Sequence, residues 1–150
     1  EQEQLINFSS YEKFNLRLQN MKKVVNHFFS NNKKKIVGYG ASTKGNIILN
    51  HCKIDSNDIK YIGDGNPQKW ERYTPGSNIK IISKSKMRKL KPTYLFVLIW
   101  SFRSEVIKQE KNFILNGGKL IFPLPIFHII DKENYKYFIN EKLSAFGFNI

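Results

Sequence analysis

From residue 35 onward, the chain alternates short apolar runs with longer stretches of helical spacing, and this alternation restricts its fold more than any other feature. The apolar runs have the length of buried strands and are too short for helices. The run at 94–100 is the most apolar, so we expect it at the centre of a sheet. In chain order, we predict strands over residues 36–39, 59–62, 79–82, 94–100 and 120–122.

Helices are predicted between these strands, over residues 44–52, 84–90 and 101–116, and again after Asp131. We expect Ile47, Ile48 and Leu49 to face the core and Ser83 to cap the short basic helix that follows it. Strands that alternate with helices need right-handed crossovers. The sequence therefore predicts a Rossmann-like α/β fold, an open parallel sheet of about four to five strands with helices on both faces.

Residues 10–30 form a predicted amphipathic helix that Ser10 can cap. Its apolar side chains recur at steps of three and four, which places them on one face: Phe14, Leu18, Met21, Val25 and Phe28. The sequence begins with Glu1 rather than Met, and we interpret it as a fragment of a longer protein. We expect residues 1–32 to link a missing upstream domain to the Rossmann-like domain at 33–150.

The net charge is +13, yet only four of the 25 basic residues are Arg, and the lysine runs lack interleaved aromatics. We therefore expect a solvated lysine surface and no nucleic-acid partner. No apolar run reaches the roughly 18 residues that span a bilayer, and the first residues do not have the pattern of a signal peptide. These features predict a cytoplasmic protein with no membrane partner. The single cysteine, Cys52, excludes an internal disulfide and a Cys-rich zinc site.

The turn after the first strand, residues 38–45, has the composition of an anion-binding loop. Ligands of open parallel sheets bind beyond the carboxyl ends of the strands. Gly38 permits a tight turn, Gly40 lets a ligand approach the backbone, and Ser42 or Thr43 can cap the next helix. The N-terminus of that helix offers free amides and a partial positive charge to an anion.

The spacing in this turn departs from the dinucleotide-binding fingerprint. The third glycine of that fingerprint falls at Thr43, and Gly45 comes two residues late. Lys44 lies in the first helical turn, where a bound phosphate would convert an unfavourable interaction with the helix dipole into an attraction. The spacing favours binding of a nucleotide or sugar phosphate, while a plain strand-to-helix turn stays an open alternative.

Three residues near other strand ends each carry two interpretations. Asp64 follows the second strand, where Rossmann domains often place the acid that binds ribose, but it also begins a run of turn-forming residues. Trp100 is either a core aromatic or a stacking surface. Arg103 can pair with a phosphate, or with Glu105 or Glu71. No metal-ligand spacing or catalytic triad is visible, so we predict no metal site and leave catalytic residues unassigned.

Several motifs together resemble the C-terminal domain of the sugar C-methyltransferase family, which uses S-adenosylmethionine, over residues 36–125. In order, the motifs are Val37 to Ser42, Lys44-Gly45-Asn46, Leu49 to Cys52, Asp64-Gly65-Asn66-Pro67, Lys69, Arg72-Tyr73-Thr74-Pro75-Gly76, Ile79, Trp100, Glu105, Gln109, Gly117-Gly118-Lys119 and Pro123-Leu124-Pro125. The family usually has Gly at Glu71 and Asn at Ser101, close to the supposed cleft, and these departures put the identity of the sugar in doubt.

The resemblance implies a ligand site made of a cradle and a cleft lining. The cradle for phosphate or sugar comprises Gly38, Tyr39, Gly40, Ala41, Ser42, Thr43, Lys44, Gly45 and Asn46. The cleft lining comprises Asn66, Lys69 and the loop from Tyr73 to Gly76. Asp64, Trp100, Ser101 and Arg103 complete the candidate ligand-binding residues.

The resemblance also implies a division of labour between domains. This domain would hold a nucleotide-linked deoxysugar, while an upstream domain binds S-adenosylmethionine and transfers the methyl group. We expect no cofactor on this chain itself and no methylation by it alone, because carbon methylation needs a base and none is recognisable. The alternatives are a free-standing NAD(P)-binding domain and a protein-interaction module whose cleft has decayed.

Overall fold

The computed structural model describes residues 8–32 and 35–140, and its core is an open sheet with the strand order β3-β2-β1-β4-β5-β6. All neighbouring strands are parallel except β6, which runs antiparallel to β5. The predicted α/β fold is confirmed, with one more strand than expected. The strands are β1 (Ile36–Tyr39), β2 (Tyr61–Asp64), β3 (Lys80–Ser83), β4 (Tyr94–Val97), β5 (Lys119–Phe122) and β6 (His128–Ile130).

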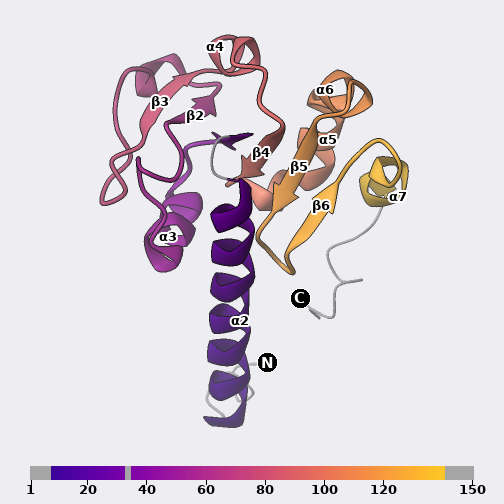
Figure 1. Ribbon diagram of the computed structural model, residues 1–150. Coiled ribbons are helices and arrows are strands. Elements are labelled where there is room, and N and C mark those ends of the chain that lie inside the picture. Colours follow the sequence, from indigo (N-terminus) through magenta and orange to yellow (C-terminus); the bar gives the residue numbers. More distant parts are fainter. Residues whose placement is uncertain (1–7, 33–34, 141–150) are drawn as a thin grey trace.

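Helices cover both faces of the sheet (Figure 1). The first face carries α2 (Phe8–Asn32) and α3 (Thr43–Cys52). The other face carries α4 (Lys84–Lys89), α5 (Arg103–Gln109), α6 (Lys111–Leu115) and α7 (Tyr135–Asn140). Two short 3-10 helices, η2 (Pro67–Lys69) and η3 (Trp100–Phe102), follow β2 and β4.

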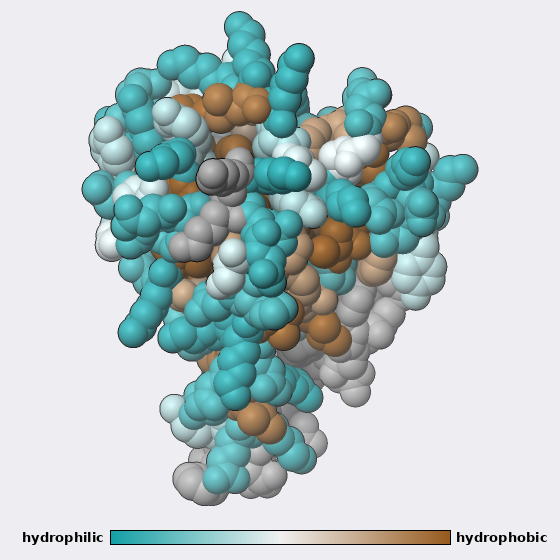
Figure 2. All heavy atoms as spheres, in the orientation of Figure 1, coloured by the Kyte–Doolittle hydropathy of each residue, from teal (hydrophilic) through white to brown (hydrophobic). Residues whose placement is uncertain are grey.

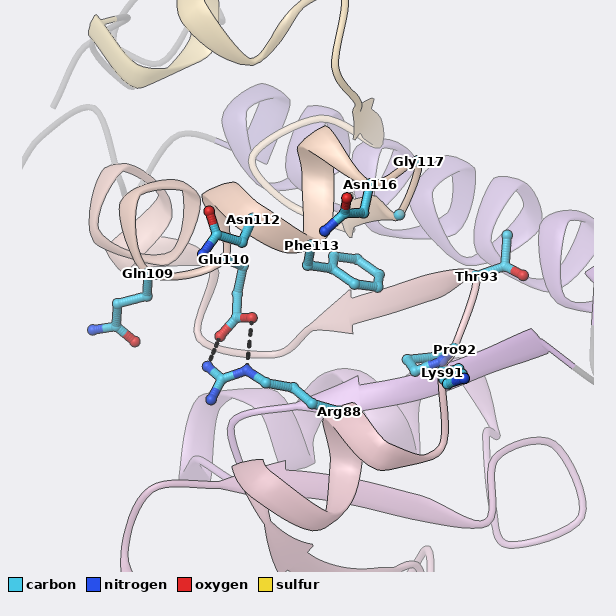
Figure 3. Close-up of a pocket in the computed structure, with 11 residues that line it drawn as sticks. Arg88, Lys91, Pro92, Thr93, Gln109, Glu110, Asn112, Phe113, Asn116 and Gly117 are labelled. Carbon is cyan, nitrogen blue, oxygen red and sulfur yellow. Dashed lines mark hydrogen bonds and ion pairs between the residues drawn. The ribbon is translucent and has the colours of Figure 1, made fainter.

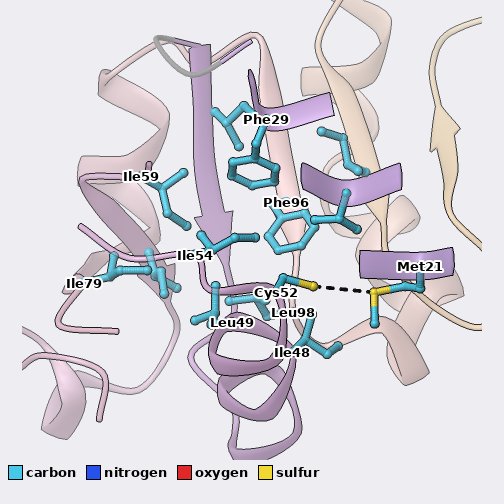
Figure 4. Packing of buried hydrophobic residues seen from close by; sticks show 14 residues of the cluster. Met21, Phe29, Ile48, Leu49, Cys52, Ile54, Ile59, Ile79, Phe96 and Leu98 are labelled. Carbon is cyan, nitrogen blue, oxygen red and sulfur yellow. Dashed lines mark hydrogen bonds between the residues drawn. The ribbon is translucent and has the colours of Figure 1, made fainter. Parts of the chain in front are cut away.

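Each face of the sheet has its own hydrophobic core, and successive side chains of the central strands point alternately into the two cores. Phe96 of β4 lies in the core under α2 and α3, whereas its neighbour Leu95 lies in the core under α4 to α6. Phe96 meets Phe29 of α2 edge to face, with ring centroids 5.1 Å apart (Figure 4). Because both faces are buried, these strands have continuous apolar sequences, which is what made them recognisable.

The helices differ from the predictions in three places. Ser10 does not cap the first helix, because α2 already begins at Phe8. Ile47 is 65% exposed, since three consecutive residues of a helix span too wide an arc to face one core. The predicted helix over 101–116 is divided at Glu110 into α5 and α6. Ser83 caps α4 as expected, its hydroxyl accepting a hydrogen bond from the Lys86 amide at 3.2 Å.

The half of α2 that packs on the sheet is its second half. Met21, Val25 and Phe29 are buried in the core, whereas Tyr11 and Phe14 are exposed. In Figure 1 the first half of α2 extends beyond the ends of β4 and β5 and away from the sheet. The domain therefore presents a projecting helix beside the edge at which its parallel strands end, which we call the carboxyl edge.

Hydrophilic side chains predominate on the face shown in Figure 2, with hydrophobic ones in small patches between them. None of the helices in the described ranges is both long and apolar enough to cross a membrane.

Candidate functional site

A groove of about 450 Å³ opens at the carboxyl edge, between the start of α3 and the segment that joins β2 to β3. Its position beyond the ends of β1 and β2 is where open α/β sheets bind ligands. The α3 side contributes Ala41, Ser42, Thr43 and Asn46; the opposite side contributes Asn66, Gln68, Lys69, Arg72, Tyr73, Thr74, Pro75 and Ile81.

Two hydrogen bonds join the sides of the groove. The Lys69 ammonium donates to the Ala41 carbonyl at 2.8 Å, and the Asn50 side-chain amide donates to the Pro75 carbonyl at 3.2 Å. Asn46 lies on α3 between these two bonds. Its side-chain oxygen is buried and has no hydrogen-bond partner among residues 8–32 and 35–140. A buried acceptor without a partner is costly, so Asn46 is suited to receive an N–H or O–H from a ligand.

The side of the groove opposite α3 has a fixed backbone. The Ile81 amide donates to the Arg72 carbonyl at 2.8 Å, which ties this segment to β3. The Thr74 hydroxyl bonds the Ser77 hydroxyl at 2.6 Å and accepts from the Ile79 amide at 2.9 Å. Tyr73, between these anchors, is 55% exposed. The Tyr73 ring and the Arg72 guanidinium therefore extend from a backbone that hydrogen bonds fix in place.

The prediction that Gly38 forms the tight turn is wrong, because Gly38 lies within β1. The predicted ligand approach at Gly40 is wrong as well, because a Cβ atom there would lie 2.6 Å from the Ile99 side chain. The glycine-rich turn at 38–45 uses most of its own amides. Gly40 has a φ of +85°, which favours glycine, and its amide donates to the Gly63 carbonyl at 2.7 Å. The Ala41 amide donates to the Asp64 carboxylate at 2.7 Å, and the Ser42 amide donates to the Gly40 carbonyl at 3.0 Å. These three amides are therefore not available to a phosphate in this conformation.

Asp64 occupies the position at this turn where an anion was expected. One carboxylate oxygen accepts from Ala41 and lies 3.5 Å from the Lys69 ammonium, and the other accepts from the Asn66 amide at 2.8 Å. Asp64 is 8% exposed. Of its two interpretations, these contacts support the turn: the carboxylate organises the turn instead of pointing outward toward a ribose.

The N-terminus of α3 is held against β4 by a cap and a glycine. The Ser42 hydroxyl accepts from the Gly45 amide at 2.9 Å and donates to the Leu98 carbonyl at 3.2 Å. A Cβ atom on Gly45 would lie 2.5 Å from the Leu98 Cβ. Gly45 therefore gives the close packing that the third glycine of a dinucleotide fingerprint provides, two residues later in the sequence. The amides of Thr43 and Lys44 belong to the first helical turn, which has no intrahelical acceptors for them.

Tyr39 points away from the groove, into a polar cluster under α4 and α5. Its hydroxyl accepts from the Lys84 ammonium at 2.7 Å and lies 3.0 Å from the Glu110 carboxylate and 3.1 Å from the Gln109 side-chain oxygen. Burial first, and then the negative charge of Glu110, raises the pKa of Tyr39 well above its ordinary value. Burial lowers the pKa of Lys84.

The candidates after β4 also lie outside the groove lining. Trp100 is half-buried and packs against both hydrophobic cores, in agreement with its core interpretation. Arg103 is buried, with its guanidinium 5.5 Å from the centroid of the Phe138 ring. The suggested pairing with Glu71 is wrong, because that carboxylate bonds Lys80 at 2.7 Å and Lys86 at 3.0 Å.

The structure therefore brings some of the predicted residues together and separates others. Nine of them line the groove: Ala41, Ser42, Thr43, Asn46, Asn66, Lys69, Tyr73, Thr74 and Pro75. The others support the turn or lie elsewhere: Gly38, Tyr39, Gly40, Lys44, Gly45, Asp64, Gly76, Trp100, Ser101 and Arg103. Gln68, Arg72 and Ile81 line the groove and were not among the candidates. Arg72 is brought back toward Lys69 by a β-turn in which Trp70 is extended and Glu71 has a φ of +63°. A non-glycine residue rarely adopts that φ, so no local pattern indicated this turn.

A larger cavity of about 820 Å³ lies at the opposite edge of the sheet, where β4 and β5 begin (Figure 3). Of its three charged residues, Arg88 and Glu110 neutralise one another, because the Arg88 guanidinium is bonded to both oxygens of Glu110, and Lys91 is the third. In parallel α/β sheets this edge does not carry the ligand. We therefore take the smaller groove at the carboxyl edge as the candidate site.

Comparison with known proteins gives two matches. A family model described as the C-methyltransferase C-terminal domain matches residues 1–125. C-methyltransferase NovU of Streptomyces niveus is 36% identical over 101 residues, an alignment that covers 67% of this chain and 24% of that protein. The chain thus aligns with about a quarter of the length of this relative.

Proposed function

This chain belongs to the C-methyltransferase C-terminal domain family, and from that premise we propose that it holds a nucleotide-linked sugar for methylation at carbon by a separate domain. The sugar would be a deoxysugar that is methylated at a carbon next to its keto group, and the site would be the groove at the carboxyl edge. The methyl donor, S-adenosylmethionine, would bind the partner domain.

The observation that carries the proposal is the chemistry of the groove. None of its twelve lining residues is acidic, and two of them, Lys69 and Arg72, are cationic. Tyr73 offers an exposed ring for stacking, and Asn46 offers a buried acceptor without a partner. Cations, an aromatic ring and an amide acceptor match the phosphates, the base and the hydroxyl or imide groups of a nucleotide sugar.

The same lining does not suit S-adenosylmethionine. That cofactor carries a positive sulfonium and a positive amino group, and it supplies an electrophilic methyl group when bound. A groove with two cations and no carboxylate would repel both positive groups. This supports our placing of the cofactor on the partner domain.

The lining also offers no obvious general base. Removing a proton from the carbon next to a ketone needs a base whose pKa is close to the working pH, most often His, Asp or Glu. The groove lining contains none of these residues. We therefore assign a binding role to this chain and no catalytic residue, and we expect no methyl transfer by the chain alone.

An NAD(P)-binding function was the main alternative. It depended on Asp64 as the ribose acceptor, but this carboxylate already accepts hydrogen bonds from Ala41 and Asn66. The geometry therefore favours the nucleotide-sugar proposal.

Isothermal titration calorimetry of the chain with dTDP, UDP, NAD and S-adenosylmethionine tests the proposal. We expect saturable binding of dTDP or UDP, and weaker or no binding of NAD and S-adenosylmethionine. Tight binding of S-adenosylmethionine, measurable methyl transfer, or no binding of either nucleotide would contradict it. The last result is what an interaction module with a decayed cleft would give.

A further inference from the structure

Resting on the proposed function, we propose that Arg72 is the principal phosphate-binding residue of this groove and that Asn46 receives an uncharged N–H or O–H group of the same ligand. The phosphates would then lie against the turn from Lys69 to Arg72, and not against the glycine-rich turn at 38–45.

The glycine-rich turn is a poor phosphate site because a carboxylate already occupies it. The Ala41 amide, which would otherwise face an anion, donates to Asp64. A phosphate at this position would have to displace a buried carboxylate or remain beside a like charge. The anion therefore has a lower electrostatic cost elsewhere in the groove.

Of the two cations in the groove, Arg72 is the one whose charge is not already paired with a carboxylate among the described residues. The Lys69 ammonium already bonds the Ala41 carbonyl and lies 3.5 Å from Asp64. The Arg72 guanidinium has no carboxylate partner among residues 8–32 and 35–140, because its neighbour Glu71 is committed to Lys80 and Lys86.

The backbone of Arg72 is held on both sides. Its carbonyl accepts from Ile81 at 2.8 Å, and its amide donates to the Lys69 carbonyl at 3.2 Å. The planar fork of a guanidinium matches two phosphate oxygens at once, and a fixed backbone reduces the ordering cost of that contact.

Asn46 determines the orientation of the ligand in the groove. Its buried side-chain oxygen is an acceptor, and so are the ionised oxygens of a diphosphate, so the two repel one another. The ligand must therefore turn its phosphates toward Arg72 and a hydrogen-bond donor toward Asn46. A hydroxyl of the sugar or ribose, or the imide N–H of a pyrimidine base, supplies such a donor.

Calorimetry with inorganic pyrophosphate and with UDP separates these two roles. Arg72→Gln should weaken the binding of both compounds about 10- to 100-fold, the range expected for a charged hydrogen-bonded contact. Arg72→Lys should give an intermediate loss. Asn46→Ala should weaken UDP several-fold and leave pyrophosphate within about twofold. Lys108→Gln, which removes an equal charge from the exposed side of α5, is the matched control and should bind both compounds like the wild type.

The outcomes distinguish this inference from the proposed function. If the wild type binds UDP but Arg72→Gln binds both compounds within twofold of it, the assignment of Arg72 is wrong and the proposed function stands. If Asn46→Ala weakens pyrophosphate as much as UDP, the orientation is wrong. If the wild type binds none of pyrophosphate, UDP and dTDP, both proposals fail. Circular dichroism confirms that each variant is folded before it is titrated.

Discussion

Replacing Arg88 with Met should destabilise the domain more than any other change to an exposed charge on α4. Glu110 is 2% exposed at the junction of α5 and α6, and Arg88 bonds both of its carboxylate oxygens. Met keeps most of the aliphatic length of Arg but removes the guanidinium. Within the described part of the chain, the buried carboxylate then keeps only its contact with the Tyr39 hydroxyl at 3.0 Å.

The size of the effect follows from burial. Removing one partner of a fully buried pair costs about 3–5 kcal/mol, and a hydrogen bond to a charged group contributes about 1.5–3 kcal/mol. Because the Arg88 side chain is 48% exposed, water can partly replace it, and we expect a loss of about 2–3 kcal/mol in the free energy of unfolding. At this chain length, that loss lowers the melting temperature by about 5–10 °C.

Urea denaturation followed by circular dichroism measures this loss. The matched control is Lys89→Met, an exposed residue on the same helix, which should change the free energy of unfolding by less than about 0.5 kcal/mol. Adding Glu110→Gln to Arg88→Met should recover part of the loss, because the buried charge is then gone. If Arg88→Met is no less stable than Lys89→Met, the ion pair does not stabilise the fold and the reasoning fails.

Two further predictions concern buried titratable groups. The pKa of Tyr39 is raised in the folded state above its ordinary value of 10.0. The neutral hydroxyl therefore contributes its full share to the free energy of unfolding below pH 10, and this contribution is lost as the pH rises further. In denaturation curves from pH 8 to 11, the wild type should lose stability more steeply above pH 10 than Tyr39→Phe, and parallel curves would contradict this. Burial raises the pKa of the Cys52 thiol to about 11, so at pH 8 Ellman's reagent should label it at least tenfold more slowly in the native protein than in urea. Equal rates would show that the thiol is accessible.

Much of the fold was predictable because the strands are buried on both faces. A strand such as Tyr94–Val97 is apolar at every position and needs no knowledge of its neighbours to be recognised. The strand His128–Ile130 was missed because it is short and follows two prolines, and its pairing with β5 depends on the turn between them. The inward placement of Ile47 failed because an apolar residue was assumed to be buried.

The site was predictable in position but not in its contacts. The glycine pattern located the turn after β1 and the groove beside it. That the Asp64 carboxylate would bond the Ala41 amide depends on how β2 lies beside β1, which no local pattern encodes. The same is true of Asn46, whose lack of a hydrogen-bond partner is visible only once the walls of the groove are in place.

Ligand-induced shifts in a two-dimensional amide NMR spectrum locate the bound nucleotide on the protein. On addition of UDP or dTDP, we expect the largest shifts at Thr43, Asn46, Arg72 and Tyr73, around the groove. Shifts confined to Asn112, Asn116 and Gly117, around the larger cavity at the other edge of the sheet, with the groove unchanged, would contradict this expectation.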